Sequence, residues 1–141
     1  MKTVLSVLCC LFVFSLQAQD ATGIDFSEGS SFEQLLAQAK IEDKLIFVDA
    51  YATWCGPCRM MDRRVFNQSE VGDFFNSNFI NLKLDVERGE GPTLARQYRV
   101  RAMPTYLFID GDGNVVHSAM GAMPQDRFLE LARAALRKQA R

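Results

Sequence analysis

The sequence predicts an α/β domain in which a central mixed β-sheet is flanked by helices on both faces. Apolar residues at helical spacing alternate along the chain with short apolar runs of strand length. The last two runs are separated only by turn-forming residues at 110–114, which indicates a hairpin. Alternating helices and strands favour parallel pairing, and the hairpin adds an antiparallel strand. The 141 residues, 48% of them hydrophobic and 23% charged, suffice for one compact domain.

The first helix is predicted from a capping box formed by Ser30 and Glu33. Apolar side chains at i, i+3, i+4 and i+7 then define one buried face: Phe32, Leu35, Leu36 and Ala39. A short strand is expected before this helix, at 24–26. The next element, at 45–51, is an almost continuous apolar run, which is typical of a central strand covered on both faces.

The remaining elements follow from the same two periodicities and from turn chemistry. Pro92 and Pro124 suit the first turns of two helices, because proline needs no backbone donor there. Helical segments are predicted after Cys58 through 65, at 69–76, at 92–98 and from 124 onwards, and strands at 79–84, 105–109 and 115–119.

Residues 1–18 have the pattern of a secretory signal peptide. Lys2 supplies the positive charge, and the apolar run 4–16 is too short to span a membrane. We expect cleavage after Ala18, which leaves a domain at 19–141; an uncleaved membrane anchor is the alternative. Leu8 before Cys9 disfavours lipidation. The protein is therefore expected to be periplasmic or secreted, as a monomer with no membrane span after cleavage.

Signal removal changes the cysteine and charge counts. Cys9 and Cys10 leave with the signal, so only Cys55 and Cys58 remain, in a compartment where disulfides can persist. The remaining chain has 15 basic and 17 acidic residues, a net charge of −2. This charge offers no basic field for nucleic acid. Zinc needs four ligands, and only His117 could join the cysteine pair, so no metal or other cofactor is expected.

The central strand is followed directly by Trp54-Cys55-Gly56-Pro57-Cys58, which opens a helix. Unpaired N–H groups and the positive dipole at a helix start favour a thiolate. We expect Cys55 to remain open to solvent and Cys58, one turn inside, to be more buried. Cys55 can then attack a substrate disulfide and Cys58 can resolve the mixed disulfide. A purely structural disulfide is disfavoured, because so small a loop removes little unfolded-state entropy.

Asp49 interrupts the apolar central strand. A carboxylate there is costly unless it has a partner or a purpose. If Asp49 lies behind the cysteine pair, burial should raise its pKa, and it could accept the proton of Cys58 during resolution. The alternative is a carboxylate held by hydrogen bonds in the core.

The segment 48–60, which contains the cysteine pair, resembles the active-site segment of the thioredoxin family. Met103-Pro104-Thr105 resembles that family's cis-proline loop, and Gly121 with the final helix is similar to its C-terminal part. The likeness runs from about residue 24 to the end. Residues 63–76 are also similar to secreted bacterial thioredoxin-like proteins and to the C-terminal domain of transmembrane thiol–disulfide interchange proteins.

This resemblance implies a thioredoxin fold and a role for each matched position. Cys55 would be the attacking nucleophile, Cys58 the resolving thiol and Asp49 the buried acid. The substrate would be bound by Trp54 beside the pair, by Gly56 and Pro57 between the cysteines, and by Met103 and Pro104. Proline has no N–H, so the backbone of Met103 would pair with a substrate strand.

Three positions depart from the usual pattern of the family. Tyr51 stands where many members have tryptophan, and Met103 replaces the commoner β-branched residue before the proline. Asn81 occupies the place expected for a lysine near the buried acid, so Asp49 is expected to lack a cationic neighbour; Lys83 lies two residues further on.

The sequence thus predicts an exported thiol–disulfide oxidoreductase that reduces or exchanges protein disulfides. No histidine lies between the cysteines to stabilise the thiolate. In this respect the pair resembles that of the reducing members of the family. A reductant in an oxidising compartment needs electrons, and a membrane-embedded thiol donor is the partner implied. The alternative is a thioredoxin-fold chaperone or adaptor that binds clients without redox turnover.

Overall fold

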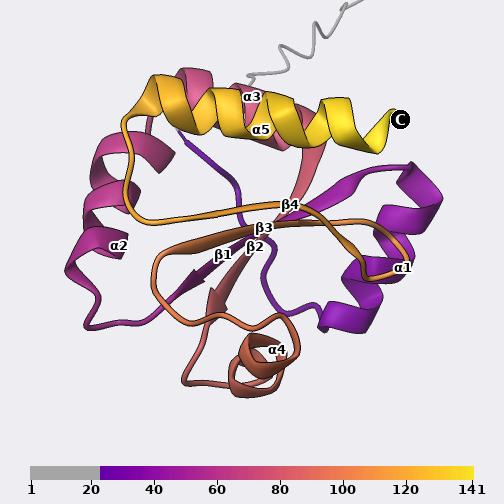
Figure 1. Cartoon of the computed structure of the whole chain (residues 1–141), viewed down its shortest axis with the longest axis horizontal. Helices are drawn as coiled ribbons and strands as arrows, with labels where there is room; N and C mark the ends of the chain where they lie inside the picture. Colours follow the sequence, from indigo (N-terminus) through magenta and orange to yellow (C-terminus); the bar gives the residue numbers. More distant parts are fainter. Residues whose placement is uncertain (1–22) are drawn as a thin grey trace, which may run out of the picture.

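The computed structural model describes residues 23–141, which are organised around one four-stranded sheet (Figure 1). The strands are β1 (Leu45–Tyr51), β2 (Phe79–Asp85), β3 (Thr105–Ile109) and β4 (Val115–Met120), in the order β2-β1-β3-β4. β1 pairs in parallel with β2 and antiparallel with β3, and β3 pairs antiparallel with β4. The predicted mixed sheet with a closing hairpin is confirmed, whereas the predicted signal segment lies outside the described residues.

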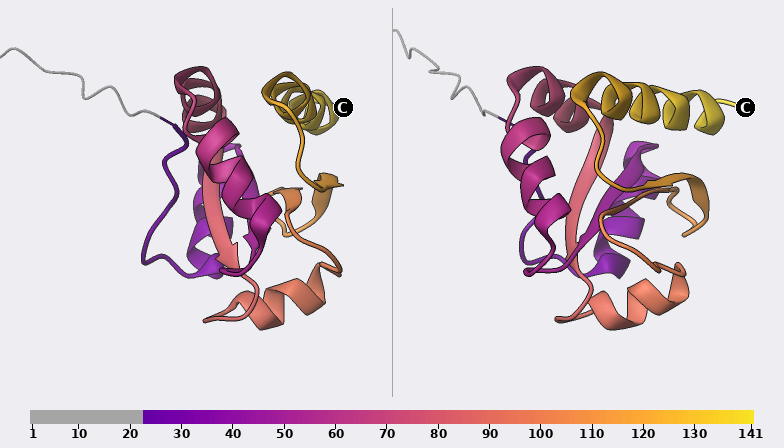
Figure 2. Two further views of the ribbon diagram at one scale, coloured as in Figure 1. Left: turned by 90° about the vertical axis from the view of Figure 1, so that its left-hand side faces the viewer. Right: turned by 60° about the vertical axis from the view of Figure 1, so that its left-hand side comes forward.

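Helices cover both faces of this sheet (Figure 2). They are α1 (Phe32–Glu42), α2 (Gly56–Met61), its π-helical continuation η1 (Asp62–Phe66), α3 (Ser69–Asn78), α4 (Gly91–Gln97) and α5 (Gln125–Gln139). Side chains from η1, α3 and α5 pack on one face, and side chains from α1 and α4 pack on the other. The two cores follow from the period-2 alternation of side chains along each strand.

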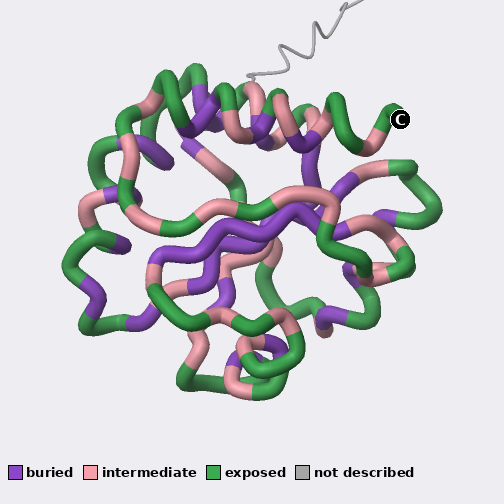
Figure 3. Tube along the Cα trace, viewed as in Figure 1, coloured by how far each residue is buried: buried purple, intermediate pink, exposed green. Residues whose placement is uncertain are grey.

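The core on the α3–α5 side is aromatic. Phe47 of β1 contacts six other rings, and the rings of Phe75 and Phe128 stack with centroids 4.8 Å apart. The opposite core is mainly aliphatic and includes Ile46 and Val48 of β1. β1 is therefore buried along almost its whole length, as the purple trace in Figure 3 shows. Asp49 is the one charged residue among the buried residues that the structure describes.

The N-cap of helix α1 is Ser31, one residue later than the predicted Ser30. Its hydroxyl accepts a hydrogen bond from the Gln34 amide, and Gln34 Oε1 accepts one from the Ser31 amide. The sequence offers two overlapping boxes, Ser30 with Glu33 and Ser31 with Gln34. The second box, which the structure uses, is accompanied by a tertiary contact: the Phe32 amide donates a hydrogen bond to Glu90, a residue near the start of α4.

The strand predicted at 24–26 is absent, and these residues run as an extended segment. The amide of Ile24 donates to the carbonyl of Phe66, and the amide of Ser27 donates to that of Asn81. Their partners lie on two different elements, so no ladder forms. Asn76 and Asn81 fix the segment further through side-chain hydrogen bonds to its backbone.

We predict that Gly72→Ala lowers the free energy of unfolding, by about 1–3 kcal/mol. Alanine normally stabilises a helix interior relative to glycine. A Cβ at Gly72, within α3, would however overlap the backbone carbonyl of Gly23 and displace the N-terminal segment. Urea unfolding measures the effect. Ser77→Ala, on the exposed side of the same helix, is the control and should be neutral or stabilising; a Gly72→Ala protein as stable as the wild type would contradict the packing described.

Candidate redox active site

The cysteine pair lies where the central strand passes into helix α2. Cys55 is the N-cap of α2, and its Sγ accepts a hydrogen bond of 3.3 Å from the Cys58 amide. Pro57 occupies the first turn, where it needs no hydrogen-bond donor. Cys55 and Cys58 form a disulfide with Cα atoms 5.4 Å apart. The helix start thus presents its N–H groups to the Cys55 sulfur, as expected from its position in the sequence.

Both cysteines are buried in this oxidised form. Cys55 is 4% exposed and Cys58 is 2% exposed. The expectation that Cys55 remains open to solvent is therefore wrong for the disulfide state. The bond turns the Cys55 side chain toward Cys58, and Tyr51, Val86 and Met103 pack against the pair.

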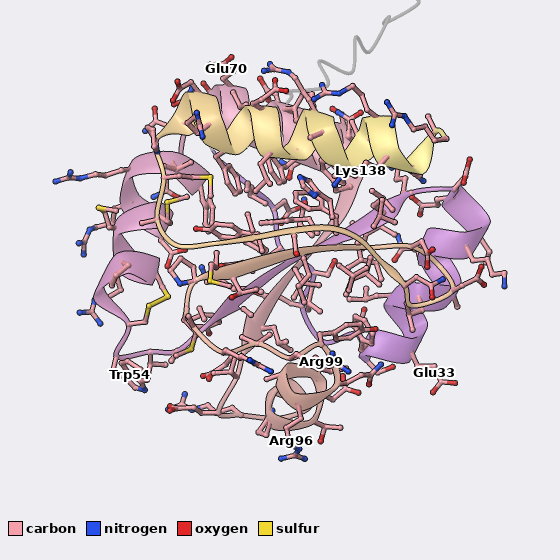
Figure 4. The ribbon with its side chains drawn as sticks, in the orientation of Figure 1. Glu33, Trp54, Glu70, Arg96, Arg99 and Lys138 are labelled. Carbon is pink, nitrogen blue, oxygen red and sulfur yellow. A yellow bond between two sulfur atoms is a disulfide. The ribbon has the colours of Figure 1, made fainter. Side chains whose placement is uncertain are left out.

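Trp54, next to Cys55, is a large apolar side chain with 62% of its surface accessible (Figure 4). Its indole N–H donates a hydrogen bond of 2.9 Å to Glu87, which follows β2. Glu87 is a residue that the sequence analysis did not assign to the site. Nothing in its local pattern could have identified it, because the two partners are 33 residues apart and meet only in the fold.

The loop before β3 forms the other side of the site. The peptide bond between Met103 and Pro104 is cis, as the family resemblance implies. Met103 contacts the cysteine cluster, and the Pro104 carbonyl accepts a hydrogen bond of 2.8 Å from the Gly121 amide. The Thr105 hydroxyl donates to the carbonyl of Ala102 and closes the turn. Segments far apart in the chain thus meet at the disulfide.

Asp49 is buried on the sheet face that carries η1, α3 and α5. It is 1% exposed, and within the described part of the chain neither carboxylate oxygen has a hydrogen-bond partner. Its neighbours across the sheet are Lys83 on β2 and Tyr106 on β3. The Lys83 ammonium lies 3.3 Å from Asp49 Oδ2. The expectation that Asp49 lacks a cationic neighbour is therefore wrong, because register places Lys83, and not Asn81, directly beside it.

Lys83 is shared with a second carboxylate, Asp62, the first residue of η1. The ammonium contacts Asp62 more closely than Asp49 and also lies 5.0–5.4 Å from the ring centres of Phe26, Tyr51 and Phe66. Asp62 was not singled out from the sequence, although its position four residues after Cys58 places it on the same helix face. Through Lys83, Asp49 is linked to the helical segment that carries Cys58.

Burial raises the pKa of Asp49 from its ordinary value of 3.8 to about 6. The Lys83 charge opposes this shift, and the Asp62 charge adds to it. The buried hydroxyl of Tyr106 has no hydrogen-bond partner among the described residues, and burial together with Asp49 raises its pKa. Asp49 can therefore gain and lose a proton near neutral pH, which is what a general base for a thiol requires.

No cluster of three or more histidine, cysteine, aspartate or glutamate side chains is placed to hold a metal ion within 23–141. In the same part of the chain, none of the helices combines the length and apolar character needed to cross a bilayer.

We predict that Asp49→Asn stabilises the protein above pH 6. Because the folded-state pKa is raised, the folded protein binds a proton that the unfolded chain releases, so stability falls as pH rises from about 4 to about 6. The shift corresponds to at most about 3 kcal/mol, which asparagine recovers. Urea unfolding at pH 4 and pH 8 measures the difference. Asp73→Asn, on the exposed surface of α3, should show no such dependence.

The same substitution separates a proton acceptor from a structural carboxylate. If Asp49 accepts the Cys58 proton, the wild-type rate of mixed-disulfide resolution should rise through pH 6, and Asp49→Asn should be at least about tenfold slower at pH 7. Stopped-flow measurement of the resolution step provides the pH–rate profile. An unchanged profile in Asp49→Asn would assign the residue a structural role only.

Comparison with known proteins agrees with this geometry. The family model of the thioredoxin-like domain matches residues 32–136. Thioredoxin from Chlorobaculum thiosulfatiphilum is 39% identical over 84 residues, which are 60% of this chain and 72% of that protein. Thioredoxin-1 from Drosophila melanogaster is 43% identical over 68 residues, which are 48% of this chain and 59% of that protein. The chain thus spans between about half and three quarters of these curated relatives.

Solved structures share the fold more completely. The solution structure of a candidate disulphide isomerase from Bacteroides thetaiotaomicron is 46% identical, with a TM-score of 0.72 over 82% of this chain and 95% of that one. The oxidised C-terminal domain of DsbD from Neisseria meningitidis has a TM-score of 0.62 over 77% of this chain and 96% of that one; at 24% identity it supports the fold alone. The chain belongs to the thioredoxin-like family of oxidoreductases, and Cys55 and Cys58 are its redox pair.

Proposed function

We propose that this protein is exported and that it reduces or exchanges disulfides of other proteins through Cys55 and Cys58. The observation that carries the proposal is the disulfide at the start of α2, connected through Lys83 and Asp62 to a buried carboxylate whose pKa lies near 6. The signal-like pattern of residues 1–18 supports export.

The reduced pair would act in two steps. The Cys55 thiolate attacks one sulfur of a client disulfide, which forms a mixed disulfide and releases the other client sulfur as a thiolate. Cys58 then gives its proton to Asp49, and its thiolate attacks the Cys55 sulfur. The second client thiol leaves, and two electrons have passed to the client. The Cys55–Cys58 disulfide is the product of this sequence.

We infer the direction of electron flow from the residues between the cysteines. Gly56 and Pro57 contribute neither a charge nor a hydrogen-bonding side chain to stabilise the Cys55 thiolate. A pair without such stabilisation favours the disulfide and acts as a reductant. The reduced form must then be restored, and we infer a membrane-embedded thiol donor, because an exported protein is cut off from cytosolic reductants.

We predict that Cys58→Ser accumulates mixed disulfides through Cys55, because the resolving thiolate is missing. Cys55→Ser should accumulate none and should lose insulin reduction. Non-reducing electrophoresis followed by mass spectrometry of the captured proteins provides the measurement, and the double variant is the control for non-specific capture. Insulin reduction retained by Cys55→Ser would show that the attacking cysteine is assigned wrongly. A wild-type protein without turnover would favour the chaperone or adaptor function.

We further predict a reduction potential near that of thioredoxin, about −270 mV. Equilibration of the purified domain with glutathione redox buffers, read by the fraction of free thiol, measures it. Protein disulfide isomerase, at about −180 mV, marks the value expected if exchange of client disulfides dominates. A potential near −120 mV, the value for DsbA, would instead make the protein an oxidant and contradict the proposed direction.

A further inference from the structure

A groove lies beside the cysteine pair, between the α2–η1 helix and the loop that joins β4 to α5. Its volume is about 450 Å³, and its lining is mainly apolar. The helix contributes one wall and the loop the other: Met60, Arg64 and Val65 face Ala122, Met123 and Pro124. The function proposed above uses none of these residues.

The groove lies along the helical segment that begins at the cysteine pair. Met60 and Arg64 follow Cys58 on the same helical segment, so the groove extends on the order of 10 Å from the pair. Its opposite wall begins one residue after Gly121, whose amide bonds the carbonyl of Pro104. An extended chain rises about 3.3 Å per residue, so the groove would receive client residues about three positions from the cysteine under attack.

The helical segment that forms one wall is rich in arginine, and Arg64 is the arginine of this segment that lines the groove. Arg59, Arg63 and Arg64 are exposed, and within residues 23–141 none of them forms an ion pair. Arg59 donates only to the backbone carbonyl of Thr53. The intervening Asp62 is engaged by Lys83. This local excess of positive charge contrasts with the net charge of −1 of the whole chain and favours an acidic partner.

One acidic side chain approaches the far end of the groove. Glu70, labelled in Figure 4 beside the start of α5, accepts a hydrogen bond of 2.7 Å from Gln125, which also lines the groove. It lies on α3, beyond the three arginines in sequence. The acidic side chain therefore lies at the Gln125 end of the groove, and Arg64 lies on the wall formed by the helix.

Two methionines, Met60 and Met123, face each other across the apolar lining, and three others lie near them. All five methionines of the described chain lie at this end of the molecule, although they come from three segments: Met60, Met61, Met103, Met120 and Met123. Met103 packs against the cysteines, and the sulfur of Met61 accepts a hydrogen bond from the Met123 amide. Unbranched, polarizable side chains adapt to different apolar partners, which suits a surface that binds more than one sequence.

We propose that this groove binds the client segment next to the target cysteine and selects extended segments in which an apolar residue is followed by acidic ones. The apolar side chain would occupy the space between Met60 and Met123, and the acidic residues would meet Arg63 and Arg64. The inference rests on the proposed function and names the class of substrate that the same site prefers.

Two cyclic disulfide peptides test this preference. Each peptide has a leucine about three residues from each cysteine, followed by two further residues. These two residues are Glu-Glu in one peptide and Lys-Lys in the other, and the peptides are otherwise identical. At low ionic strength we expect kcat/KM for the acidic peptide to be about tenfold higher, and 0.5 M NaCl should reduce the difference. Arg64→Glu should bring the ratio near one, and Arg64→Lys should preserve it.

The matched control is Arg96→Glu, which reverses an exposed charge on α4, well away from α2 in Figure 4. It should leave the ratio of the two peptides unchanged. Replacing the leucine by serine should lower kcat/KM for the acidic peptide, and Met60→Gln should remove that difference. Unfolding midpoints of all variants establish that each is folded.

A neutral substrate, bis(2-hydroxyethyl) disulfide, separates the two proposals. Turnover of this compound with equal rates for the acidic and basic peptides would overturn the groove as a selective surface and leave the proposed function intact. The groove would also be overturned as a selective surface if Arg96→Glu changed the ratio of kcat/KM for the two peptides as much as Arg64→Glu does. The preference would then reflect the overall charge of the protein. No turnover of any disulfide would contradict the proposed function itself, and with it this inference.

Discussion

A carboxylate buried in the central strand, with one ammonium shared between it and a second carboxylate, is the interaction around which the site is organised. Asp49 has no hydrogen bond from the residues described, and Lys83 divides its charge between Asp49 and Asp62. A fully satisfied ion pair would hold Asp49 ionised, whereas isolation would keep it protonated. Burial raises the pKa of Asp49 and the shared ammonium opposes this shift, so the pKa lies between these limits, at about 6.

The burial of β1 stabilises the fold but makes the charged form of Asp49 unfavourable. β1 must be covered on both faces to stabilise the fold, and the same cover removes water from Asp49. The rings of Tyr51 and Phe66 beside the Lys83 ammonium offset part of the cost of burying that charge. Stability is thus traded for a group that can exchange a proton near pH 6.

Several parts of this arrangement could be predicted from local sequence. The apolar run of β1, the turn at 110–114 and the proline at the start of α2 each depend on neighbouring residues only. The positions of Cys55, Cys58 and Asp49 follow from the same reasoning. The choice between the two overlapping capping boxes could not be predicted in this way, because both satisfy the same local rule. The box that forms is accompanied by the contact of Phe32 with Glu90, which arises only in the fold.

Sequence alone determined the chemistry of this protein: two cysteines at a helix start, an acid in a buried strand and a proline loop, all specified by residue type and spacing. The tertiary structure decided how that chemistry is tuned. Strand register placed Lys83 beside Asp49, the π-helical turn brought Asp62 to the same ammonium, and the packing of two distant segments formed the apolar groove. Such contacts depend on how elements far apart in the chain meet, which local patterns do not encode.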